Sequence, residues 1–317
     1  MRLGLLSTAK INDALLEGVP EGVEIAAVAS RDAARAQAYA SEHGIGRAHG
    51  GYEDLLGDEE IDAVYVSLPN RLHHEWTLKA IAAGKHVLVE KPYSRRSADA
   101  EEAWAAADRA GVVVMEAFMW RHHPQAEVAR KLVAEGAIGR LRAIRTTFGF
   151  MLHELDNIRM APELDGGALM DVGCYCISGA RLLAGEPEHV FGEQVLGPTG
   201  VDVDFYGTLR FPGDVVAQFD ASFTLPKRQR LEAVGEEGTL VVEAPWRADW
   251  GGRVLVNGEP VPVPEANSYG RELSNLAAAI TGTEPSLLGR EDAVAQARAI
   301  EALYRSAETG ETVALGT

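Results

Sequence analysis

The first 120 residues alternate short apolar runs with helical patterns, and this alternation restricts the possible folds more than any other feature. Five runs are predicted as buried strands: Leu3–Leu6, Val23–Ala29, Ala63–Ser67, Lys85–Val89 and Val112–Glu116. Helices are predicted between them at Ala33–His43, His74–Ala83 and Ser97–Ala110. Strands and helices in this order are typical of an α/β domain with a doubly wound parallel sheet.

After Pro124 the alternation gives way to successive strands. One more helix is predicted at Val128–Glu135, followed by strands at Arg142–Phe150, Glu188–Leu196, Asp202–Phe211, Val215–Phe223 and Arg230–Glu243. Short breaks such as Pro212-Gly213-Asp214 indicate antiparallel neighbours in a sheet with one solvated face. Helices are predicted at Ala168–Leu183, Tyr269–Thr281 and Arg290–Thr309. We therefore expect two domains, residues 1–120 and residues 121–317.

The charge balance restricts the kind of partner. Thirty basic residues face 47 acidic ones, a net charge of −17, and no Lys/Arg cluster occurs. This argues against nucleic acid and anionic membranes as partners. No apolar run approaches the ~20 residues that span a bilayer, and the apolar stretch after Met1 is too short for a secretory signal. We expect a cytoplasmic protein with a small-molecule substrate.

Cysteines and histidines give no sign of a metal site. Cys174 and Cys176 are too close for an ordinary disulfide and lack partners at zinc spacing, so we expect reduced, buried thiols. The pairs His73-His74 and His122-His123 point in different directions, and no H-x-x-x-H occurs. His73, after the Leu68-Pro69-Asn70 turn, is instead expected to be a cleft residue.

The segment Lys85–Pro92 places two ionisable residues where a buried strand ends. Ligands of open α/β sheets bind outside the carboxyl ends of the strands, so Glu90 and Lys91 are expected to face a site. Pro92 keeps Lys91 extended or in a turn. A lysine in such a crevice is suited to proton transfer, although a surface lysine would fit the local pattern equally well.

Two turns of the first domain bear on a nucleotide. Ser7, Ala9 and Asn12 occupy the glycine positions of the G-x-G-x-x-G fingerprint, so this turn alone does not indicate a nucleotide site. The second strand ends in Ser30-Arg31-Asp32, with Arg35 nearby. Arginines without a carboxylate at the strand end favour NADP over NAD, since NAD enzymes usually hold the ribose with an acidic residue there. Otherwise Asp32 caps the next helix and Arg31 lies in solvent.

A third cluster follows Gly166-Gly167, where the backbone is expected to run close to a neighbour. On the helix that begins there, Asp171 and Tyr175 stand four residues apart and share one face. A solvated edge explains this pair equally well unless Lys91 points at it. Lysine, aspartate and tyrosine together would form a coupled acid/base set.

Taken together, these motifs resemble the glucose–fructose oxidoreductase/inositol dehydrogenase (Gfo/Idh/MocA) family, most of all its D-xylose dehydrogenase and dimeric dihydrodiol dehydrogenase branch. The resemblance covers nearly the whole chain, and Glu90-Lys91-Pro92 is its most specific motif. Further matches are residues 4–9 (Gly-Leu-Leu-Ser-Thr-Ala), Ser30-Arg31-Asp32, Pro69-Asn70 with His73, Arg121 with Pro124, Ile138-Gly139, and Gly166-Gly167 with Asp171. The chain departs from much of the family at Tyr175, where histidine is common.

The resemblance implies a Rossmann domain followed by an α/β domain whose large open, mostly antiparallel sheet commonly forms a dimer interface. It implies hydride exchange between NADP, or less readily NAD, and a carbinol carbon of a sugar or polyol, with a cis Lys91–Pro92 bond. The catalytic residues implied are Lys91, Asp171 and Tyr175, with either Tyr175 or Lys91 carrying the proton. The implied cofactor contacts are Ser7, Thr8, Ala9, Lys10, Ile11, Ser30, Arg31, Arg35, Leu68, Pro69, Asn70, His73, Glu90, Lys91, Trp120 and Arg121. The implied substrate contacts are Lys91, Trp120, Phe150, His153, Asn157, Arg159, Asp171 and Tyr175.

Several functions are compatible with these residues. Oxidation of D-xylose or another aldopyranose at C1 leads, followed by trans-dihydrodiol oxidation and ketosugar reduction. An NADP-binding regulator without chemistry is the alternative from a different class. A homodimer or homotetramer through the open sheet is expected in each case.

Overall fold

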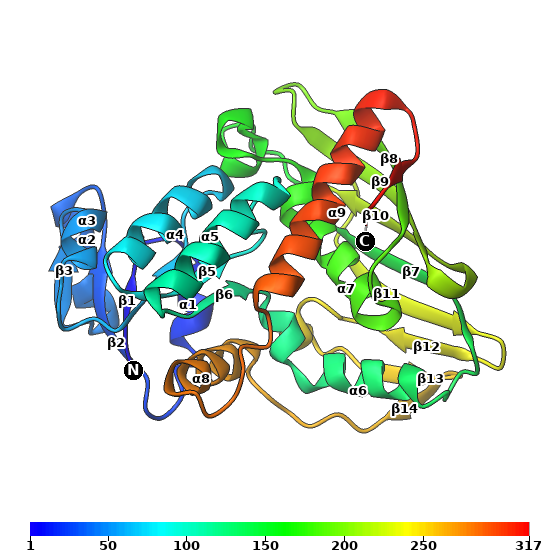
Figure 1. The fold of residues 1–317 in the computed structure, drawn as a ribbon, viewed down its shortest axis with the longest axis horizontal. Coiled ribbons are helices and arrows are strands. Elements are labelled where there is room, and N and C mark those ends of the chain that lie inside the picture. The colour runs from blue at the N-terminus through cyan, green and yellow to red at the C-terminus, as the bar shows by residue number, and fades with distance from the viewer. Residues whose placement is uncertain (317) are drawn as a thin grey trace. The chain divides into compact units, whose positions relative to one another are not determined.

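The computed structural model describes residues 1–316, which form two compact units (Figure 1). The first unit contains Met1–Ser94, Ala98–Met119 and Asn267–Val294. The second contains Arg95–Ser97, Trp120–Ala266 and the chain from Ala295 onward. Residues 267–294 thus lie in the first unit, whereas the sequence assigned them to the second domain.

The first unit contains a six-stranded sheet in the order β3-β2-β1-β4-β5-β6. All five pairings are parallel. The strands are β1 (Arg2–Leu5), β2 (Glu24–Ala29), β3 (Arg47–His49), β4 (Ala63–Val66), β5 (His86–Glu90) and β6 (Val114–Ala117). This is the strand order of dinucleotide-binding doubly wound folds, so the predicted fold class is confirmed for this unit.

Helices connect these strands: α1 (Ile11–Leu16), α2 (Ala33–His43), α3 (Tyr52–Leu56), α4 (His73–Ala82) and α5 (Ser97–Ala110). A sixth helix, α8 (Ser268–Thr281), returns to this unit from late in the chain. Its start lies against the end of α1, because a Cβ on Gly270 would be 2.5 Å from the carbonyl oxygen of Gly18. Its amphipathic pattern predicts a helix but not which sheet that helix covers, and this explains the wrong assignment.

The second unit contains a nine-stranded sheet in the order β14-β13-β12-β11-β7-β10-β9-β8-β15. The strands are β7 (Leu141–Gly149), β8 (His189–Leu196), β9 (Asp202–Phe211), β10 (Val215–Ser222), β11 (Arg228–Gly235), β12 (Thr239–Val242), β13 (Val254–Val256), β14 (Glu259–Val261) and β15 (Val313–Ala314). Neighbours are antiparallel except β7 and β10, which are parallel. The predicted large, mostly antiparallel sheet is therefore confirmed.

One predicted strand is wrong in its extent. The sequence predicted Arg230–Glu243 as a single strand, whereas the structure divides it into β11 and β12. The chain turns between them, with the N–H of Gly235 donating to the carbonyl of Gly238 at 2.9 Å. A uniformly alternating pattern hides such a hairpin, because the side-chain period of two is the same on both sides of the turn.

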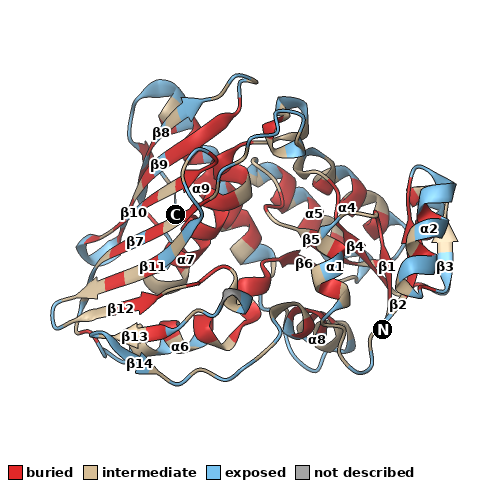
Figure 2. Cartoon of the chain, turned by 180° about the vertical axis from the view of Figure 1, so that it is seen from behind, coloured by how far each residue is buried: buried red, intermediate tan, exposed pale blue. Residues whose placement is uncertain are grey.

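The helices of the second unit are α6 (Pro124–Ala134), α7 (Cys174–Ala184) and α9 (Arg290–Thr309), the last of which begins in the first unit. A π-helical turn, Leu169–Gly173, leads directly into α7. Helix α7 packs on the inner face of the sheet, where a Cβ on Gly179 would lie 2.9 Å from the side chain of Leu231 on β11. Figure 2 shows the resulting alternation on β10, where Val215, Ala217 and Phe219 are buried and the residues between them are more exposed.

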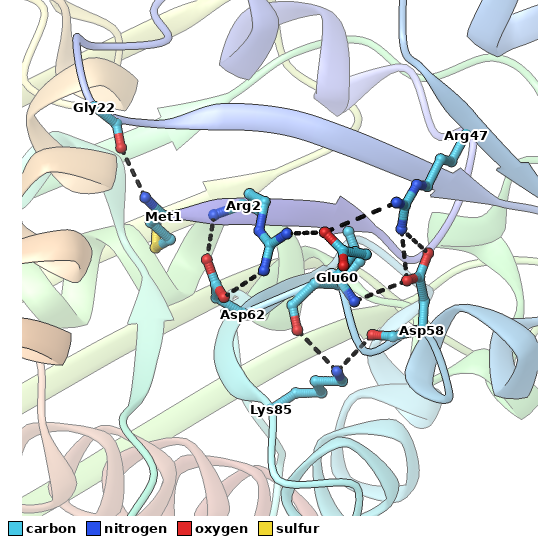
Figure 3. Close-up of polar contacts among 9 residues, drawn as sticks. Met1, Arg2, Gly22, Arg47, Asp58, Glu60, Asp62 and Lys85 are labelled. Carbon is cyan, nitrogen blue, oxygen red and sulfur yellow. Dashed lines mark hydrogen bonds and ion pairs between the residues drawn. The ribbon is translucent and has the colours of Figure 1, made fainter.

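The amino ends of the first unit's strands are held by a polar network (Figure 3). The main-chain N–H of Arg2 donates to Asp62 at 2.7 Å, and Arg47 pairs with Asp58 at 2.7 Å. Lys85 donates to the carbonyls of Asp58 and Ile61 at 2.7 and 2.8 Å. Buried carbonyls are costly when unpaired, so this network stabilises the edge of the sheet opposite to Lys91.

Three observations concern other classes of site. In residues 1–316, no helix is both long and apolar enough to cross a membrane. The same residues contain no group of three or more His, Cys, Asp or Glu side chains placed to hold a metal ion. Cys174 and Cys176 are free and buried, and burial raises the pKa of the Cys176 thiol well above its ordinary value.

Candidate active site

Lys91 follows directly after β5, at the carboxyl edge of the parallel sheet, and is half-buried. The Lys91–Pro92 peptide bond is cis, which confirms the prediction. The carboxylate of Glu90 accepts the hydroxyl of Tyr65, a buried residue of β4, and the main-chain N–H of Lys91 at 3.2 Å. These contacts fix the strand end from which Lys91 extends.

His73 lies beneath this edge rather than in an open cleft, because its side chain is fully buried. Its ring nitrogens lie 2.9 Å from the carbonyl oxygen of Pro92 and 2.7 Å from that of Leu68. Burial is the main reason that the pKa of His73 is lowered to about 4, so the ring is neutral and donates to only one of them at a time. His73 therefore joins the turn after β4 to the loop after Lys91.

The turn after β1 is shaped by side chains where the fingerprint has glycines. The hydroxyl of Ser7 donates to the carbonyl of Ser67 at 2.9 Å and accepts the N–H of Ala9 at 3.0 Å. The side-chain amide of buried Asn12 donates to the carbonyl of Ser7 at 2.8 Å. Thr8, Ala9 and Ile11 remain half-buried and Lys10 is exposed, so this turn presents its backbone at the surface of the first unit.

The end of β2 carries two exposed arginines, Arg31 and Arg35. Asp32 caps α2, accepting the N–H groups of Ala34 and Arg35 at 2.8 and 3.2 Å. Within residues 1–316, neither guanidinium pairs with a carboxylate. The one carboxylate in this segment is thus engaged in capping, while two cations remain available to an anion.

In the second unit, Asp171 lies on the π-helical turn before α7, a feature that is frequent at functional sites. Arg159 donates from Nε to Asp171 Oδ2 at 2.6 Å. Asn157 in turn accepts the N–H of Arg159 at 3.1 Å. The structure therefore brings three predicted substrate-binding residues together.

Tyr175 lies in an aromatic cluster at the start of α7. Its ring centroid is 5.4 Å from that of Phe148 and 6.0 Å from that of Trp246. Trp246 is fully buried, and its indole N–H donates to the carbonyl of Thr147 at 3.0 Å. No sequence motif pointed to Trp246. A usable signal is Gly179 on α7, where a Cβ would lie 2.5 Å from the Trp246 ring.

The remaining predicted residues of the second unit differ in exposure. Trp120 is 2% exposed and packs edge-on against Trp246 with ring centroids 5.0 Å apart. Phe150 packs against Phe223 with centroids 5.4 Å apart, and His153 is exposed. Trp120 therefore supports the aromatic cluster, whereas His153 lies at the surface of its unit.

The first unit has the fold and strand order of a dinucleotide-binding domain, and the second carries a paired carboxylate and guanidinium, with a tyrosine four residues after the carboxylate. Comparison with known proteins identifies the class. Residues 7–118 match the model of an oxidoreductase family with an NAD-binding Rossmann fold, and residues 127–241 match the Gfo/Idh/MocA C-terminal domain. The protein is an oxidoreductase of this fold. It belongs to the Gfo/Idh/MocA family, which confirms the resemblance seen in the sequence.

Three relatives show the range of this similarity. A D-xylose 1-dehydrogenase (NADP(+)) of Haloferax volcanii is 39% identical over 99% of this chain and 100% of its own length. A trans-1,2-dihydrobenzene-1,2-diol dehydrogenase of Mus musculus is 32% identical over 83% and 80%. The crystal structure of a 3-ketoreductase from Actinomadura kijaniata, in complex with NADP and TDP-benzene, has a TM-score of 0.90 at 30% identity and covers 96% of this chain and 97% of that one.

Proposed function

We propose that the protein is an NADP-dependent dehydrogenase that oxidises a sugar at a carbinol carbon, with D-xylose C1 as the leading reaction. The observation that carries this proposal is the end of β2, where Asp32 caps α2 and the exposed Arg31 and Arg35 pair with no carboxylate of the described residues. Two cations at this place suit the 2′-phosphate of NADP. The name and the full-length coverage of the Haloferax relative support the same cofactor and substrate.

The first unit would hold the cofactor with the residues already described. Arg31 and Arg35 bind the 2′-phosphate, with Ser30 beside them, and the turn Ser7–Ile11 offers its backbone N–H groups to the pyrophosphate. The remaining contacts that we propose in this unit are Leu68, Pro69, Asn70, Glu90 and Lys91, and Arg121 is proposed from the second unit. When bound, NADP would supply the hydride acceptor for the substrate carbon.

Proton transfer is assigned to Tyr175, Lys91 and Asp171 as a set. Tyr175 takes the proton from the substrate hydroxyl, and Lys91 stabilises the phenolate and orients the substrate oxygen. Asp171, anchored by Arg159, holds a substrate hydroxyl or the lysine. The competing assignment makes Lys91 the proton carrier.

The substrate class rests on the second unit. Asn157, Arg159, Asp171 and Tyr175 offer hydrogen bonds to a hydroxylated ring, and Phe150 and His153 complete the proposed wall. Oxidation of trans-dihydrodiols and reduction of ketosugars are the alternative reactions, since the mouse relative is named a dihydrodiol dehydrogenase and the Actinomadura protein a 3-ketoreductase.

A two-part measurement tests the function. Titration by the fluorescence of NADPH should show binding, and NADP with a panel of aldopyranoses should give an absorbance increase at the reduced-nicotinamide band, largest with D-xylose. A dihydrodiol and a ketosugar with NADPH are tested in parallel. Tight NADPH binding with no turnover of any substrate would instead identify an NADP-binding regulator.

We also propose that the outer face of the nine-stranded sheet joins copies of this chain into a homodimer or homotetramer. A hollow of about 450 Å³ lies on this face, lined by the exposed rings of Phe191 and Tyr206 and by charges of both signs, Arg145, Arg230, Glu193, Asp220 and Glu232. Mixed charges allow a self-complementary contact about a twofold axis. Phe191→Asp should reduce the molar mass measured by light scattering to that of one chain.

We also propose that the protein is cytoplasmic. Its two cysteines form no disulfide, which suits the reducing conditions of that compartment.

A further inference from the structure

A buried aspartate outside the proposed catalytic set touches the backbone that leads to it. Asp202, the first residue of β9, is 3% exposed. Its Oδ2 accepts the main-chain N–H of Leu169 at 2.7 Å, and its Oδ1 accepts the hydroxyl of Tyr304 at 2.9 Å. Burying a carboxylate is costly unless it is hydrogen-bonded, so these two contacts are what makes this position tolerable.

The Leu169 contact lies at the start of the π-helical turn that carries Asp171. Gly167, two residues before Leu169, has φ +123°. A Cβ on this residue would lie 2.1 Å from Oδ1 of Asp202. The carbonyl of Gly167 accepts the N–H of Asp171 at 3.0 Å. Asp202 therefore packs against the very residues that set where this turn begins, and Gly167 permits the close approach.

Tyr304 connects this carboxylate to α9 and to the segment before α5. Its side chain is buried, and the guanidinium of Arg95 lies 3.9 Å above its ring. A nitrogen of Arg95 is also 3.9 Å from a carboxylate oxygen of Asp165, just before the paired glycines. Burial raises the pKa of Asp202 to about 6, and the bonds from Leu169 and Tyr304 oppose this rise. At neutral pH and above, Asp202 is therefore mainly a carboxylate, which accepts from both donors.

We propose that Asp202, supported by Tyr304, is a positioning residue that fixes the π-helical turn and so the places of Asp171 and Tyr175. The inference rests on the proposed function for its catalytic consequence, but the anchoring of the turn does not depend on it. If Asp202 only linked β9 to α9, a hydrogen bond with Tyr304 alone would be enough. The bond goes to Leu169, which is the first residue of the turn that carries Asp171 and lies five residues before the start of α7, and this points to positioning.

The chain offers a matched control on the same strand. Asp204 is also buried, at 8% exposed, and accepts the hydroxyls of Ser222 and Thr224 at 2.5 and 2.7 Å. Both partners lie on or just after β10, outside Leu169–Tyr175. Asp204→Asn therefore reproduces the loss of a buried charge without loosening the turn.

The test compares Asp202→Asn, Tyr304→Phe and Asp204→Asn in the full-length protein. We expect Asp202→Asn to lower kcat roughly 10- to 100-fold, because small displacements of reacting groups have effects of this size. The KM for the sugar and the Kd for NADPH should stay within about threefold of the wild type, since the lost contact orients reacting groups rather than the cofactor. Tyr304→Phe, which keeps the ring, should lower kcat in the same direction by less. Asp204→Asn should keep kcat within about threefold even where its Tm falls equally.

Amide hydrogen exchange tests whether Asp202 anchors the π-helical turn, and this measurement requires no enzymatic turnover. The amides of residues 169–175 should exchange at least about tenfold faster in Asp202→Asn than in the wild type. Their exchange rates should be unchanged in Asp204→Asn. Unchanged exchange in both Asp202→Asn and Tyr304→Phe, or kcat losses that follow Tm equally in Asp202→Asn and Asp204→Asn, would overturn the proposal. If the wild type oxidises no sugar while the exchange difference holds, the proposed function fails and the anchoring role stands.

Discussion

The guanidinium of Arg159 donates from Nε to Oδ2 of Asp171 across 2.6 Å, so the carboxylate proposed to act in catalysis is already paired within its own unit. The Asp171 side chain is 15% exposed and that of Arg159 39% exposed. The pair is therefore accessible enough to exchange partners with a substrate hydroxyl, yet sheltered enough for the bond to orient the carboxylate.

Removing this partner should impair catalysis. Arg159→Gln should lower kcat/KM about tenfold, the low end for a charge-assisted hydrogen bond, because the partly exposed arginine is screened by water. Arg253→Gln, which breaks the bidentate pair of Arg253 with Glu243 on the same unit, is the control and should leave kcat/KM unchanged. Steady-state kinetics on the best sugar measures both, and equal losses in the two variants would contradict the role of Arg159.

Cofactor choice should depend on Arg31. Arg31→Ala removes a charge-assisted bond to the 2′-phosphate worth roughly 1.5–3 kcal/mol, so NADP affinity should fall about 10- to 150-fold while NAD affinity hardly changes. Fluorescence titration with both reduced cofactors measures this. Arg109→Ala, at an exposed arginine near the end of α5, is the control. Equal loss for the two cofactors would mean that Arg31 does not contact the 2′-phosphate.

Two variants distinguish Tyr175 from Lys91 as the proton carrier. Tyr175→Phe keeps the ring that packs against Phe148 but removes the proton, so turnover should fall roughly 10²–10⁴-fold with NADP affinity nearly intact. Lys91→Met should cost at least as much, and the double variant should lose far less than the product of both, because the residues act as a unit. Retained turnover in Tyr175→Phe beside an inactive Lys91→Met would assign the proton to lysine.

The aromatic cluster behind Tyr175 leaves no room at Gly179. Gly179→Ala would place a methyl group 2.5 Å from the Trp246 ring, so unfolding free energy should fall by about 1–3 kcal/mol, as for other overpacked cores. Urea denaturation measures the loss. Gly46→Ala, whose nearest contact would be 3.9 Å away, is the control and should change stability little.

A buried carboxyl on α8 should make stability depend on pH. Glu272 is 1% exposed, and Oε1 has no hydrogen-bond partner among the described residues. Burial, and secondly the charge of Glu90, raises the pKa of Glu272 well above its ordinary value of 4.5. Because the folded-state pKa is the higher one, folding binds a proton. As pH rises above that ordinary value, the Glu272 carboxyl ionises in the unfolded state, and the unfolding free energy of the protein therefore falls.

Glu272→Gln removes this titration. The variant should gain unfolding free energy relative to the wild type, and the gain should grow as pH rises from about 5 to about 9. Glu284→Gln, at an exposed position of the same unit, should show no such trend. Urea denaturation across that range measures the difference, and a gain that is constant with pH would show that Glu272 does not titrate differently on folding.

Local patterns predicted the first unit well and the second unit's supporting contacts poorly. The parallel strands follow from short stretches of sequence, and the cis bond before Pro92 was implied by the resemblance of the Glu90-Lys91-Pro92 motif to its family, so both could be predicted. Asp202 and Trp246 could not, because nothing near them in the chain distinguishes them from ordinary strand and loop residues. They reach the helix that carries Tyr175 only through the order of strands in the nine-stranded sheet.

The burial of His73 was missed for a related reason. A histidine after a strand-ending turn has the same pattern whether it faces a ligand or bridges two main-chain carbonyls. The loop after Lys91 follows a different strand, β5, and only its position determines whether His73 faces a ligand or bridges the two carbonyls.

The return of α8 to the first unit has a consequence for synthesis of the protein. The six parallel strands are complete once Met119 has left the ribosome, but their unit still lacks residues 267–294. At ~5–20 residues per second, roughly 10–35 s pass before Val294 is made. During that time the surface that later receives α8 is uncovered, and the second unit also still lacks most of α9. Both units are therefore completed by the same last stretch of chain, so a nascent chain released early leaves neither one finished.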